Sequence, residues 1–267
     1  MESTGILVLG HSRPAHLAAV LESLARQEAL GLVCVWLDGA QGKSIWQTKV
    51  RQCREVAACY PGLLVTIMNG HLGIEKLMLD ALGYMATRYH RIIVLEDDCF
   101  PTRTAVTTFL HALDGIRDEE QFFSVYGHPF LVSGENGRFP RFQGWGWATW
   151  SHKLEPILAE AKLRYAMAEP DYRAWVEQAL TPQVHERLAA TPGRYPPARL
   201  IYSWDSCFAL LTAMQGLCHR RTSPRVIYNC GLGPDSSHFP DAERWRRPPY
   251  NMIRLEEVWN YFDNEQL

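Results

Sequence analysis

Short apolar runs alternate with helical patterns over the first hundred residues of this chain. The runs predict buried strands at 6–9, 32–37, 63–68 and 92–95. Helices are expected after the loop 10–14, over 49–59 and over 74–89, because apolar residues recur there at helical spacing. Strands that are apolar throughout are typical of a mostly parallel sheet with helices on both faces. The pattern therefore predicts an α/β fold.

The second half of the chain has a less regular pattern. We expect one continuous body between residues 2 and 238, because no repeat, low-complexity segment or flexible linker interrupts it. The predicted elements are a strand at 122–126, a glycine-rich aromatic loop at 134–146, helices over 153–190, a proline-rich connector at 191–197, a helix at 204–215 and a short amphipathic helix at 255–262.

Composition excludes several classes of protein. The chain has 267 residues, of which 47% are hydrophobic and 21% charged, as in ordinary globular proteins. Its formal net charge of −2 gives no reason to expect a nucleic-acid partner. No apolar segment approaches the ~18 residues of a membrane-spanning helix, and the N-terminal run lacks the basic start of a signal peptide. Scattered cysteines without a C-x-x-C pair argue against a disulfide framework or structural zinc site.

The acidic triplet Glu96-Asp97-Asp98 follows the predicted strand 92–95 directly. In an open parallel sheet, ligands bind beyond the carboxyl ends of the strands. Three consecutive acids repel one another unless a cation compensates, and a hard divalent cation that bridges carboxylate and diphosphate oxygens fits this need. A solvated acidic turn is the alternative.

The segment Val-Leu-Glu-Asp-Asp-Cys-Phe-Pro, residues 94–101, resembles the metal-binding D-x-D-type element of GT-A-fold glycosyltransferases. It is most similar to the N-acetylglucosaminyltransferase that begins complex N-glycans and to soluble bacterial relatives of it. The resemblance implies a GT-A fold in which Asp98 binds Mn²⁺, or Mg²⁺ in its place. It further implies that Glu96 and Asp97 contact the sugar nucleotide and support the site.

Other motifs follow in the order that the family has. The resemblance implies a donor site that also includes Gly10, His11, Ser12, Arg13, Asp38 and His71. In the family, an acid at the position of Asp38 hydrogen-bonds the uracil ring, and a histidine near His71 contacts the base or the diphosphate. Each residue also has a simpler interpretation. An Asp at the end of a strand is more often a turn residue or a helix cap, and His71 taken alone is better explained as a surface-loop histidine.

Glycines and tryptophans are concentrated at 144–150. Glycine lets a backbone approach a ligand, and an indole offers a flat apolar face on which a sugar ring stacks. Similar segments line the donor and acceptor site in the resembled family. A tryptophan-rich core strand is the alternative, which we favour for Trp150. The residues expected to contact the sugar or acceptor are Gly144, Trp145, Gly146, Trp147 and Trp204.

The Trp204-Asp205 pair matches the pair that supplies the catalytic base in the family. A carboxylate there takes the proton of the acceptor hydroxyl as its oxygen attacks the anomeric carbon, and a single displacement inverts that centre. The family's second acid is Ser206 here, so the assignment depends on Asp205 alone. The alternative is that Asp205 caps the following helix.

Two C-terminal features complete the set. The segment 229–238 resembles an N-x-G-x-G-x-x-x-x-H ending of bacterial members, which makes His238 a second candidate metal ligand. The basic segment Arg244–Arg247 has three interpretations: a lid over the diphosphate, a weak contact with an anionic membrane surface, or a solvated segment.

The resemblance predicts a nucleotide-sugar-binding half at 1–133, an acceptor-binding and catalytic half at 134–240, and a C-terminal tail with a short helix at 241–267. The expected activity is metal-dependent, inverting transfer of GlcNAc or another hexose from a UDP-sugar to a glycan, lipid-linked or small-molecule acceptor, as in polysaccharide biosynthesis. We expect a cytoplasmic, bacterial protein, peripheral to the inner membrane if the basic segment contacts lipid. Two alternatives are a sugar-phosphate nucleotidyltransferase and a non-catalytic carbohydrate-binding protein. The first class needs a G-x-G-x-R loop, and this chain lacks the second glycine of that loop.

Overall fold

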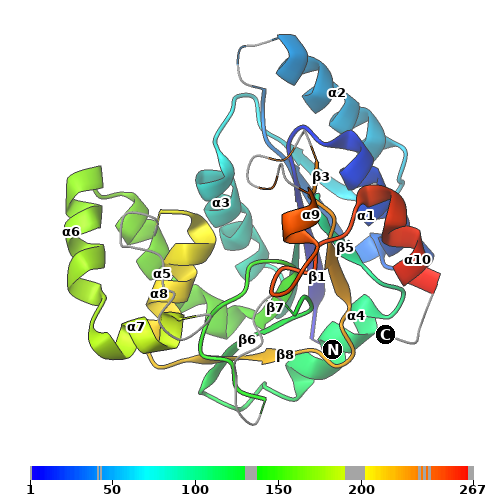
Figure 1. Cartoon of the computed structure of the whole chain (residues 1–267). Coiled ribbons are helices and arrows are strands. Elements are labelled where there is room, and N and C mark those ends of the chain that lie inside the picture. The colour runs from blue at the N-terminus through cyan, green and yellow to red at the C-terminus, as the bar shows by residue number, and fades with distance from the viewer. Residues whose placement is uncertain are drawn as a thin grey trace.

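A seven-stranded sheet with the order β3-β2-β1-β4-β7-β6-β8 forms the centre of the molecule (Figure 1). The computed structural model describes residues 2–40, 42, 44–129, 137–189, 202–233, 236, 239 and 242–263. The strands of this sheet are β1 (Thr4–Gly10), β2 (Val33–Leu37), β3 (Leu64–Ile67), β4 (Arg91–Glu96), β6 (Phe122–Tyr126), β7 (Trp147–Trp150) and β8 (Cys218–Arg221). Only β7 runs antiparallel to its neighbours, so the predicted α/β fold with a mostly parallel sheet is confirmed.

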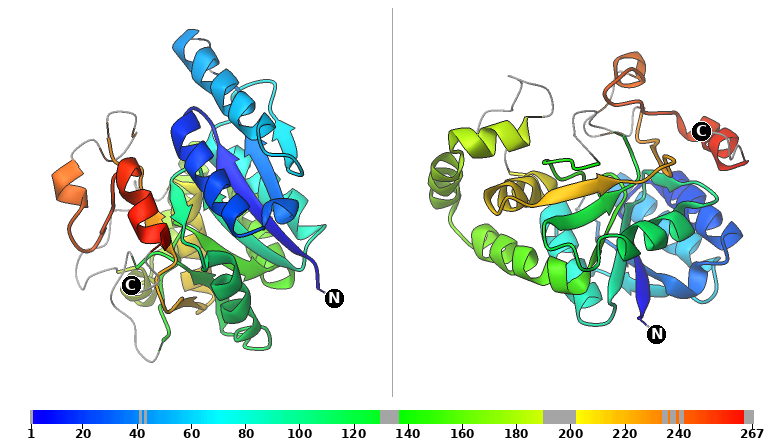
Figure 2. Two further views of the ribbon diagram at one scale, coloured as in Figure 1. Left: turned by 90° about the vertical axis from the view of Figure 1, so that its right-hand side faces the viewer. Right: turned by 90° about the horizontal axis from the view of Figure 1, so that it is seen from below.

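Helices cover both faces of the sheet (Figure 2). They are α1 (Pro14–Arg26), α2 (Ser44–Ala58), α3 (Ile74–Ala86), α4 (Ala105–Asp114), α5 (Ser151–Tyr165), α6 (Glu169–Ala179), α7 (Pro182–Leu188), α8 (Trp204–Met214), α9 (Ala242–Trp245) and α10 (Val258–Asp263), with 3₁₀ turns η1 (Leu30–Leu32) and η3 (Leu255–Glu257). Along β1, Ile6 and Val8 pack with α1, α2 and α4, whereas Leu7 and Leu9 pack with α3, α5 and α8. This double coverage explains why the strand is apolar at every position.

One strand differs from this prediction. β3 lies at the edge of the sheet, where Leu64, Val65 and Ile67 are 53%, 39% and 42% exposed. An edge strand has a neighbour on one side only, and the helices of the described chain leave these side chains in solvent. Helices therefore cover β3 less completely than they cover the central strands.

A small antiparallel sheet ties the acidic segment to the C-terminal part of the chain. It pairs β5 (Cys99–Pro101) with β9 (Ile227–Asn229), and Cys99 is opposite Asn229. Phe100 and Tyr228 then pack with Val258 and Phe262, so the predicted C-terminal helix, observed as η3 followed by α10, packs back onto the body. None of the described helices has the length and apolar character needed to cross a bilayer.

The two predicted halves share one sheet. β7, from the predicted acceptor half, pairs with β4 of the predicted nucleotide half, with Ile93 opposite Ala148. The predicted boundaries at 133–134 and 240–241 and the predicted connector 191–197 fall on or beside residues outside the described part of the chain. The helical prediction for 153–190 corresponds to α5, α6 and α7.

Candidate functional site

The acidic triplet lies at the carboxyl edge of the parallel strands. Glu96 is the last residue of β4, and Asp97 and Asp98 form the turn into β5. Because β1 and β4 are parallel neighbours, the loop that follows β1 reaches the same edge. His11 in that loop donates its backbone N–H to Asp97 Oδ2 at 3.4 Å. The topology thus brings the predicted donor loop to the acids.

Arg13 binds both aspartates of the triplet. Its Nη1 donates to Asp98 Oδ2 at 2.7 Å, and its Nη2 donates to Asp97 Oδ1. The side chains are 21% exposed for Arg13, 5% for Asp97 and 13% for Asp98, so solvent screens these ion pairs only weakly. Burial lowers the pKa of the Arg13 guanidinium, but Asp97 and Asp98 outweigh it and raise that pKa well above its ordinary value. Arg13 therefore remains charged and joins the two carboxylates.

Asp205 contributes a fourth carboxyl group to this edge. Burial, followed by the negative charge of Asp98, raises the pKa of Glu96 to about 8, and Asp205 adds to this rise while Arg13 opposes it. One Asp205 oxygen, Oδ1, accepts from Ser203 Oγ and from the backbone N–H of Ser206 at 2.9 Å. Oδ2 has no hydrogen-bond partner among the described residues. Asp205 therefore has one oxygen that is oriented by two donors and one that receives no donor from the described part of the chain.

The N-cap alternative for Asp205 is wrong. The N-cap residue of α8 is Ser203, and Asp205 lies within the first turn of the helix. An acid in the first turn is favoured by the helix dipole, and Asp205 Oδ1 accepts the N–H of Ser206 in that turn. The neighbouring loop approaches closely, since a Cβ on Gly144 would lie 3.1 Å from the Asp205 Cβ. The backbone at Gly144 thus lies beside the candidate base.

Two further residues of this site, Asn229 and Gly231, were not singled out from the sequence. Asn229 Nδ2 donates to Asp98 Oδ1 at 3.3 Å, and the N–H of Cys230 donates to the Asp98 carbonyl at 2.8 Å. A Cβ on Gly231 would lie 2.1 Å from Asp98 Oδ2, so glycine leaves the room that this carboxylate occupies. The N-x-G start of the predicted C-terminal motif was the available signal. His238, at the end of that motif, lies outside the described residues.

The chemistry of this edge fits a hard divalent cation. Among the described residues, Arg13 pairs with Asp97 and Asp98, while Glu96 and Asp205 add carboxyl groups whose charges act on the same edge. The remaining negative charge calls for additional positive charge. Carboxylate oxygens are the ligands that Mg²⁺ and Mn²⁺ prefer.

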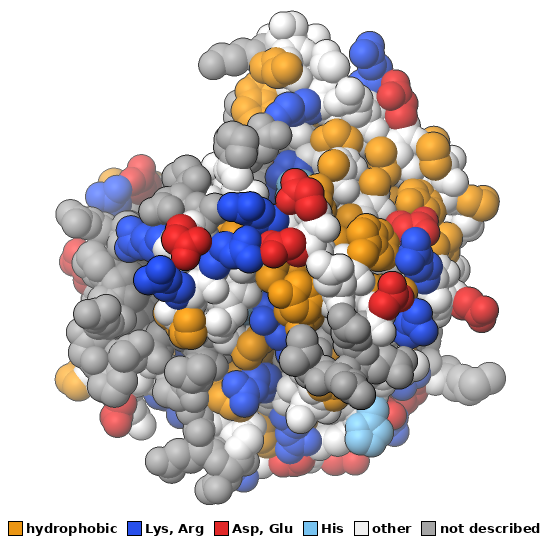
Figure 3. Space-filling view, turned by 45° about the vertical axis from the view of Figure 1, so that its right-hand side comes forward, with side chains coloured by type: hydrophobic (Ala, Val, Ile, Leu, Met, Phe, Trp, Pro, Cys, Tyr) orange, Lys and Arg blue, Asp and Glu red, His pale blue; other side chains and the backbone are white. Residues whose placement is uncertain are grey.

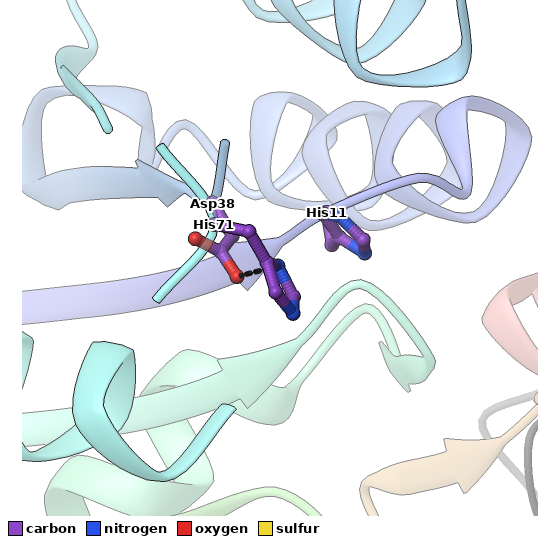
Figure 4. Close-up of side chains that lie close together, drawn as sticks. All are labelled: His11, Asp38 and His71. Carbon is purple, nitrogen blue, oxygen red and sulfur yellow. Dashed lines mark ion pairs between the residues drawn. The ribbon is translucent and has the colours of Figure 1, made fainter. Parts of the chain in front are cut away.

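A second cluster consists of His11, Asp38 and His71, whose potential ligand atoms all lie within 4.8 Å of one another (Figure 4). Asp38 is only 2% exposed. Its Oδ1 accepts the N–H groups of Gly39 and Leu72, both at 2.8 Å, and its Oδ2 lies 3.1 Å from the Gly73 nitrogen and 2.8 Å from His71 Nδ1.

These contacts change the interpretation of Asp38. A carboxylate offers about four lone-pair directions, and four donors already use them. In this structure Asp38 thus accepts from groups of the chain itself, and its contact with a uracil ring stays a prediction. Asp38 holds the loop after β3 and orients His71. Because a carboxylate only accepts, His71 Nδ1 carries a proton and its Nε2 is left for a ligand.

Stacked rings extend this second cluster. The His11 ring lies 5.7 Å from that of Trp46 with an interplanar angle of 15°, and 5.1 Å from that of His71. His11 Nε2 lies 3.2 Å from the Gly39 carbonyl oxygen. Burial lowers the pKa of His11 below its ordinary value, although Asp38 opposes the effect. His11 is thus neutral at pH 7, and Trp46 is a site residue that the sequence pattern did not reveal. Gly10, the last residue of β1, and Ser12, in the loop that follows it, are both buried.

Two of the predicted sugar-binding tryptophans belong to the core. Trp147 is fully buried and Trp204 is 4% exposed, and their rings stack 6.3 Å apart. Neither ring has a face open to a sugar, so we no longer count Trp147 and Trp204 among the candidate sugar-binding residues. Trp150 is a core residue as favoured from sequence, and its Nε1 donates to the Leu113 carbonyl at 2.9 Å. Half-buried Trp145 remains a candidate.

The two glycines of that segment have different surroundings. Gly144 lies against Asp205, as described above, whereas Gly146 adopts a φ of 67° and packs on the Ile227 side chain. A Cβ at Gly146 would lie 2.6 Å from Ile227 Cγ1, so this glycine serves packing and a left-handed backbone rather than an open ligand surface.

The basic C-terminal segment pairs with acids of its own. Arg246 donates to both carboxylate oxygens of Glu257, at 3.1 and 2.9 Å, and Arg247 lies 3.3 Å from Glu243. The Arg244 guanidinium lies 4.8 Å from the centre of the Trp245 ring. Figure 3 shows acidic side chains among the basic ones on the face in view. This pairing favours the solvated interpretation of the segment.

Comparisons with known proteins provide structural neighbours of low similarity. No family model matches the chain, and no curated protein matches it. Among solved structures, it is similar to the mannosyltransferase PcManGT from Pyrobaculum calidifontis in complex with GDP-Man and Mn²⁺, at 16% identity, TM-score 0.45, and 80% and 74% coverage of this and that chain. S. aureus TarS is 12% identical with a TM-score of 0.47, and the match covers 85% of this chain and 36% of TarS. A cytidylyltransferase from Leptospira borgpetersenii is 14% identical with a TM-score of 0.38, and the match covers 59% of this chain and 64% of that protein. The chain thus spans less than two thirds of the last two, and function has to be argued from its own residues.

Proposed function

We propose that this chain is a metal-dependent glycosyltransferase that moves a sugar from a nucleotide-sugar donor, of which UDP-sugars are the first choice, to an acceptor hydroxyl with inversion. One observation carries the proposal: the acidic triplet Glu96-Asp97-Asp98 lies at the carboxyl edge of the sheet, where Arg13 from the loop after β1 pairs with both aspartates. Such a charge cluster is costly for folding alone and useful for binding a cation with a diphosphate.

Asp98 is the proposed metal ligand, with His238 as a second one from outside the described residues. A bound Mn²⁺ or Mg²⁺ supplies Lewis-acid charge that stabilises the leaving diphosphate. The close approach of the Gly231 backbone to Asp98 and the partial exposure of this carboxylate support the assignment.

Asp205 is the proposed general base. Ser203 and the backbone of Ser206 orient its Oδ1, and Oδ2, which has no partner among the described residues, is the oxygen that we assign to the acceptor. Oδ2 takes the proton of the acceptor hydroxyl while that oxygen forms a bond to the anomeric carbon and the bond to the diphosphate breaks. A single displacement of this kind inverts the anomeric carbon. Gly144 and Trp145 line the side from which we expect the acceptor, whether glycan, lipid-linked or small molecule.

The cluster of His11, His71 and Trp46 is the proposed nucleobase site. Two imidazole rings and an indole offer stacking faces, and His71 Nε2 offers a hydrogen-bond position whose direction Asp38 sets. In this arrangement Asp38 is a positioning residue. Its effect on the nucleotide is transmitted through His71 and the loop 70–73.

The test is a screen of UDP-sugars with Mn²⁺ or with EDTA, on wild type, Asp98→Asn and Asp205→Asn. Wild type should hydrolyse or transfer one donor only with metal, and Asp98→Asn should lose metal-dependent UDP binding. Asp205→Asn should bind UDP normally and lose turnover. Proton NMR of the first product should show the inverted anomer.

Two other outcomes would support the alternative functions instead of this proposal. Pyrophosphate release from a nucleoside triphosphate and a sugar 1-phosphate would identify a nucleotidyltransferase. Sugar binding that ignores metal, Asp98 and Asp205 would identify a carbohydrate-binding protein without turnover.

A further inference from the structure

Arg13 neutralises the carboxylate to which the metal is assigned. Its Nη1 lies 2.7 Å from Asp98 Oδ2, while the other Asp98 oxygen receives the amide of Asn229 at 3.3 Å. Both oxygens are thus engaged by protein donors before any ligand arrives. A metal that binds Asp98 Oδ2 directly has to lie beside the Arg13 guanidinium on the same oxygen.

The two donors differ in charge. The Asn229 amide is neutral and is tolerated beside a cation, whereas the Arg13 guanidinium is positive and repels it at short range. The backbone at Gly231 closes the remaining side, because a Cβ there would lie 2.1 Å from Asp98 Oδ2 and 3.3 Å from Arg13 Nη1. Arg13 is therefore the group that a metal displaces.

The position of Arg13 in the chain allows this displacement. Its carbonyl accepts the N–H of Leu17 at 3.0 Å, and Pro14 follows it as the first residue of α1, so its backbone is fixed. The guanidinium at the end of a flexible stem is free to leave the carboxylates without moving the helix. A planar guanidinium pairs well with two oxygens of a phosphate group.

We propose that Arg13 is an internal counter-cation that competes with the divalent metal for Asp98, and that the released guanidinium then binds the donor diphosphate. Metal and nucleotide diphosphate consequently bind with positive coupling. The metal separates Arg13 from Asp98 and so makes the guanidinium available to the diphosphate, and the diphosphate holds Arg13 away from Asp98 and so makes this carboxylate available to the metal. The inference rests on the proposed metal site at Asp98, and it assigns to Arg13 a role in the order of loading in addition to donor contact.

The experiment measures Mn²⁺ affinity from the electron paramagnetic resonance signal of the free ion, with and without UDP. The proteins are wild type, Arg13→Met, Arg13→Lys and Asp98→Asn, with Arg173→Met as a matched control, because Arg173 pairs with Glu169 on α6 and is 60% exposed. Wild type should bind Mn²⁺ weakly alone and about tenfold or more tightly with UDP. Arg13→Met should bind Mn²⁺ more tightly alone and gain less from UDP, and Arg173→Met should equal wild type.

A second measurement separates displacement from simple charge repulsion. The side-chain Nε–Hε resonance of Arg13, assigned by its loss in Arg13→Lys, is followed during titration with diamagnetic Mg²⁺. Displacement shifts this resonance over the concentrations at which Mg²⁺ binds. A resonance that stays unchanged at saturation overturns the inference.

The remaining outcomes distinguish this inference from the proposed function. If Asp98→Asn abolishes Mn²⁺ binding but Arg13→Met leaves it unchanged or weaker, the metal site stands and the competition is refuted. If no protein binds Mn²⁺ with or without UDP, both the competition and the metal dependence are refuted.

Discussion

His71 Nδ1 lies 2.8 Å from Asp38 Oδ2, and the same carboxylate binds the backbone of the loop that carries His71. Asp38, an acid at the end of a strand, thus holds His71 in one tautomer. Removal of the Asp38 carboxylate should therefore weaken nucleotide binding through the change in His71.

Asp38→Asn should lower UDP affinity about tenfold or more, as does the loss of other residues that orient a ligand-binding histidine. The amide nitrogen of the variant cannot accept from the loop, so His71 is no longer held with its proton on Nδ1. Calorimetry measures the affinity, and ¹⁵N shifts of the His71 ring report the tautomer. An unchanged tautomer with unchanged affinity would show that His71 is positioned by other contacts.

Gly231→Ala should weaken Mn²⁺ binding about 10–100-fold, because its Cβ would lie 2.1 Å from the oxygen of the proposed ligand Asp98. Gly42→Ala is the control, since a Cβ at Gly42 meets nothing within 4 Å. Binding is measured as for the Arg13 variants. Equal Mn²⁺ affinities in Gly231→Ala and Gly42→Ala would mean that Asp98 is not the ligand.

Trp147→Ala should destabilise the fold by about 3–5 kcal/mol, the cost typical of removing a large buried aromatic ring. Trp145→Ala, at a half-buried position, should cost less stability and raise KM for the acceptor. Urea unfolding and steady-state kinetics give both values. A stable Trp147→Ala protein with a raised acceptor KM would restore Trp147 to the sugar-binding wall.

His219 makes stability depend on pH. Burial, together with the positive charge of Arg187, lowers the pKa of His219 from 6.5 to about 3. Its Nδ1 lies 2.8 Å from Ser124 Oγ inside the sheet. A folded pKa below the unfolded one means that the unfolded state binds the additional proton between these two values. Stability is therefore fully present above pH 6.5 and falls as the pH decreases towards 3, by up to about 1.4 kcal/mol per pH unit from this group.

The variant His219→Gln removes this titration and keeps a polar group near Ser124. Its free energy of unfolding should depend less steeply on pH than that of wild type between pH 6 and about 4, with carboxylates contributing equally to both proteins. Identical slopes in urea unfolding at several pH values would show that His219 does not titrate on unfolding.

Much of the fold followed from local pattern. Apolar runs such as Ile6 to Leu9 have to be buried on both faces, and the intervening helical patterns supply the cover, so the α/β class was predictable. The position of Glu96-Asp97-Asp98 at a strand end was predictable for the same reason. The exposure of β3 was not, because strand order decides which strand lies at an edge, and apolar content alone does not reveal it.

The sequence by itself determined the fold class, the position of the acidic triplet and the presence of chemically capable side chains near it. Only the tertiary structure decided how these side chains are used: that Arg13 pairs with Asp98, 85 positions away, that four donors saturate Asp38, and that Trp147 faces the core. Propensity and periodicity act over a few neighbouring residues. Burial, ion pairing and hydrogen-bond saturation depend on groups that only the packed chain brings together.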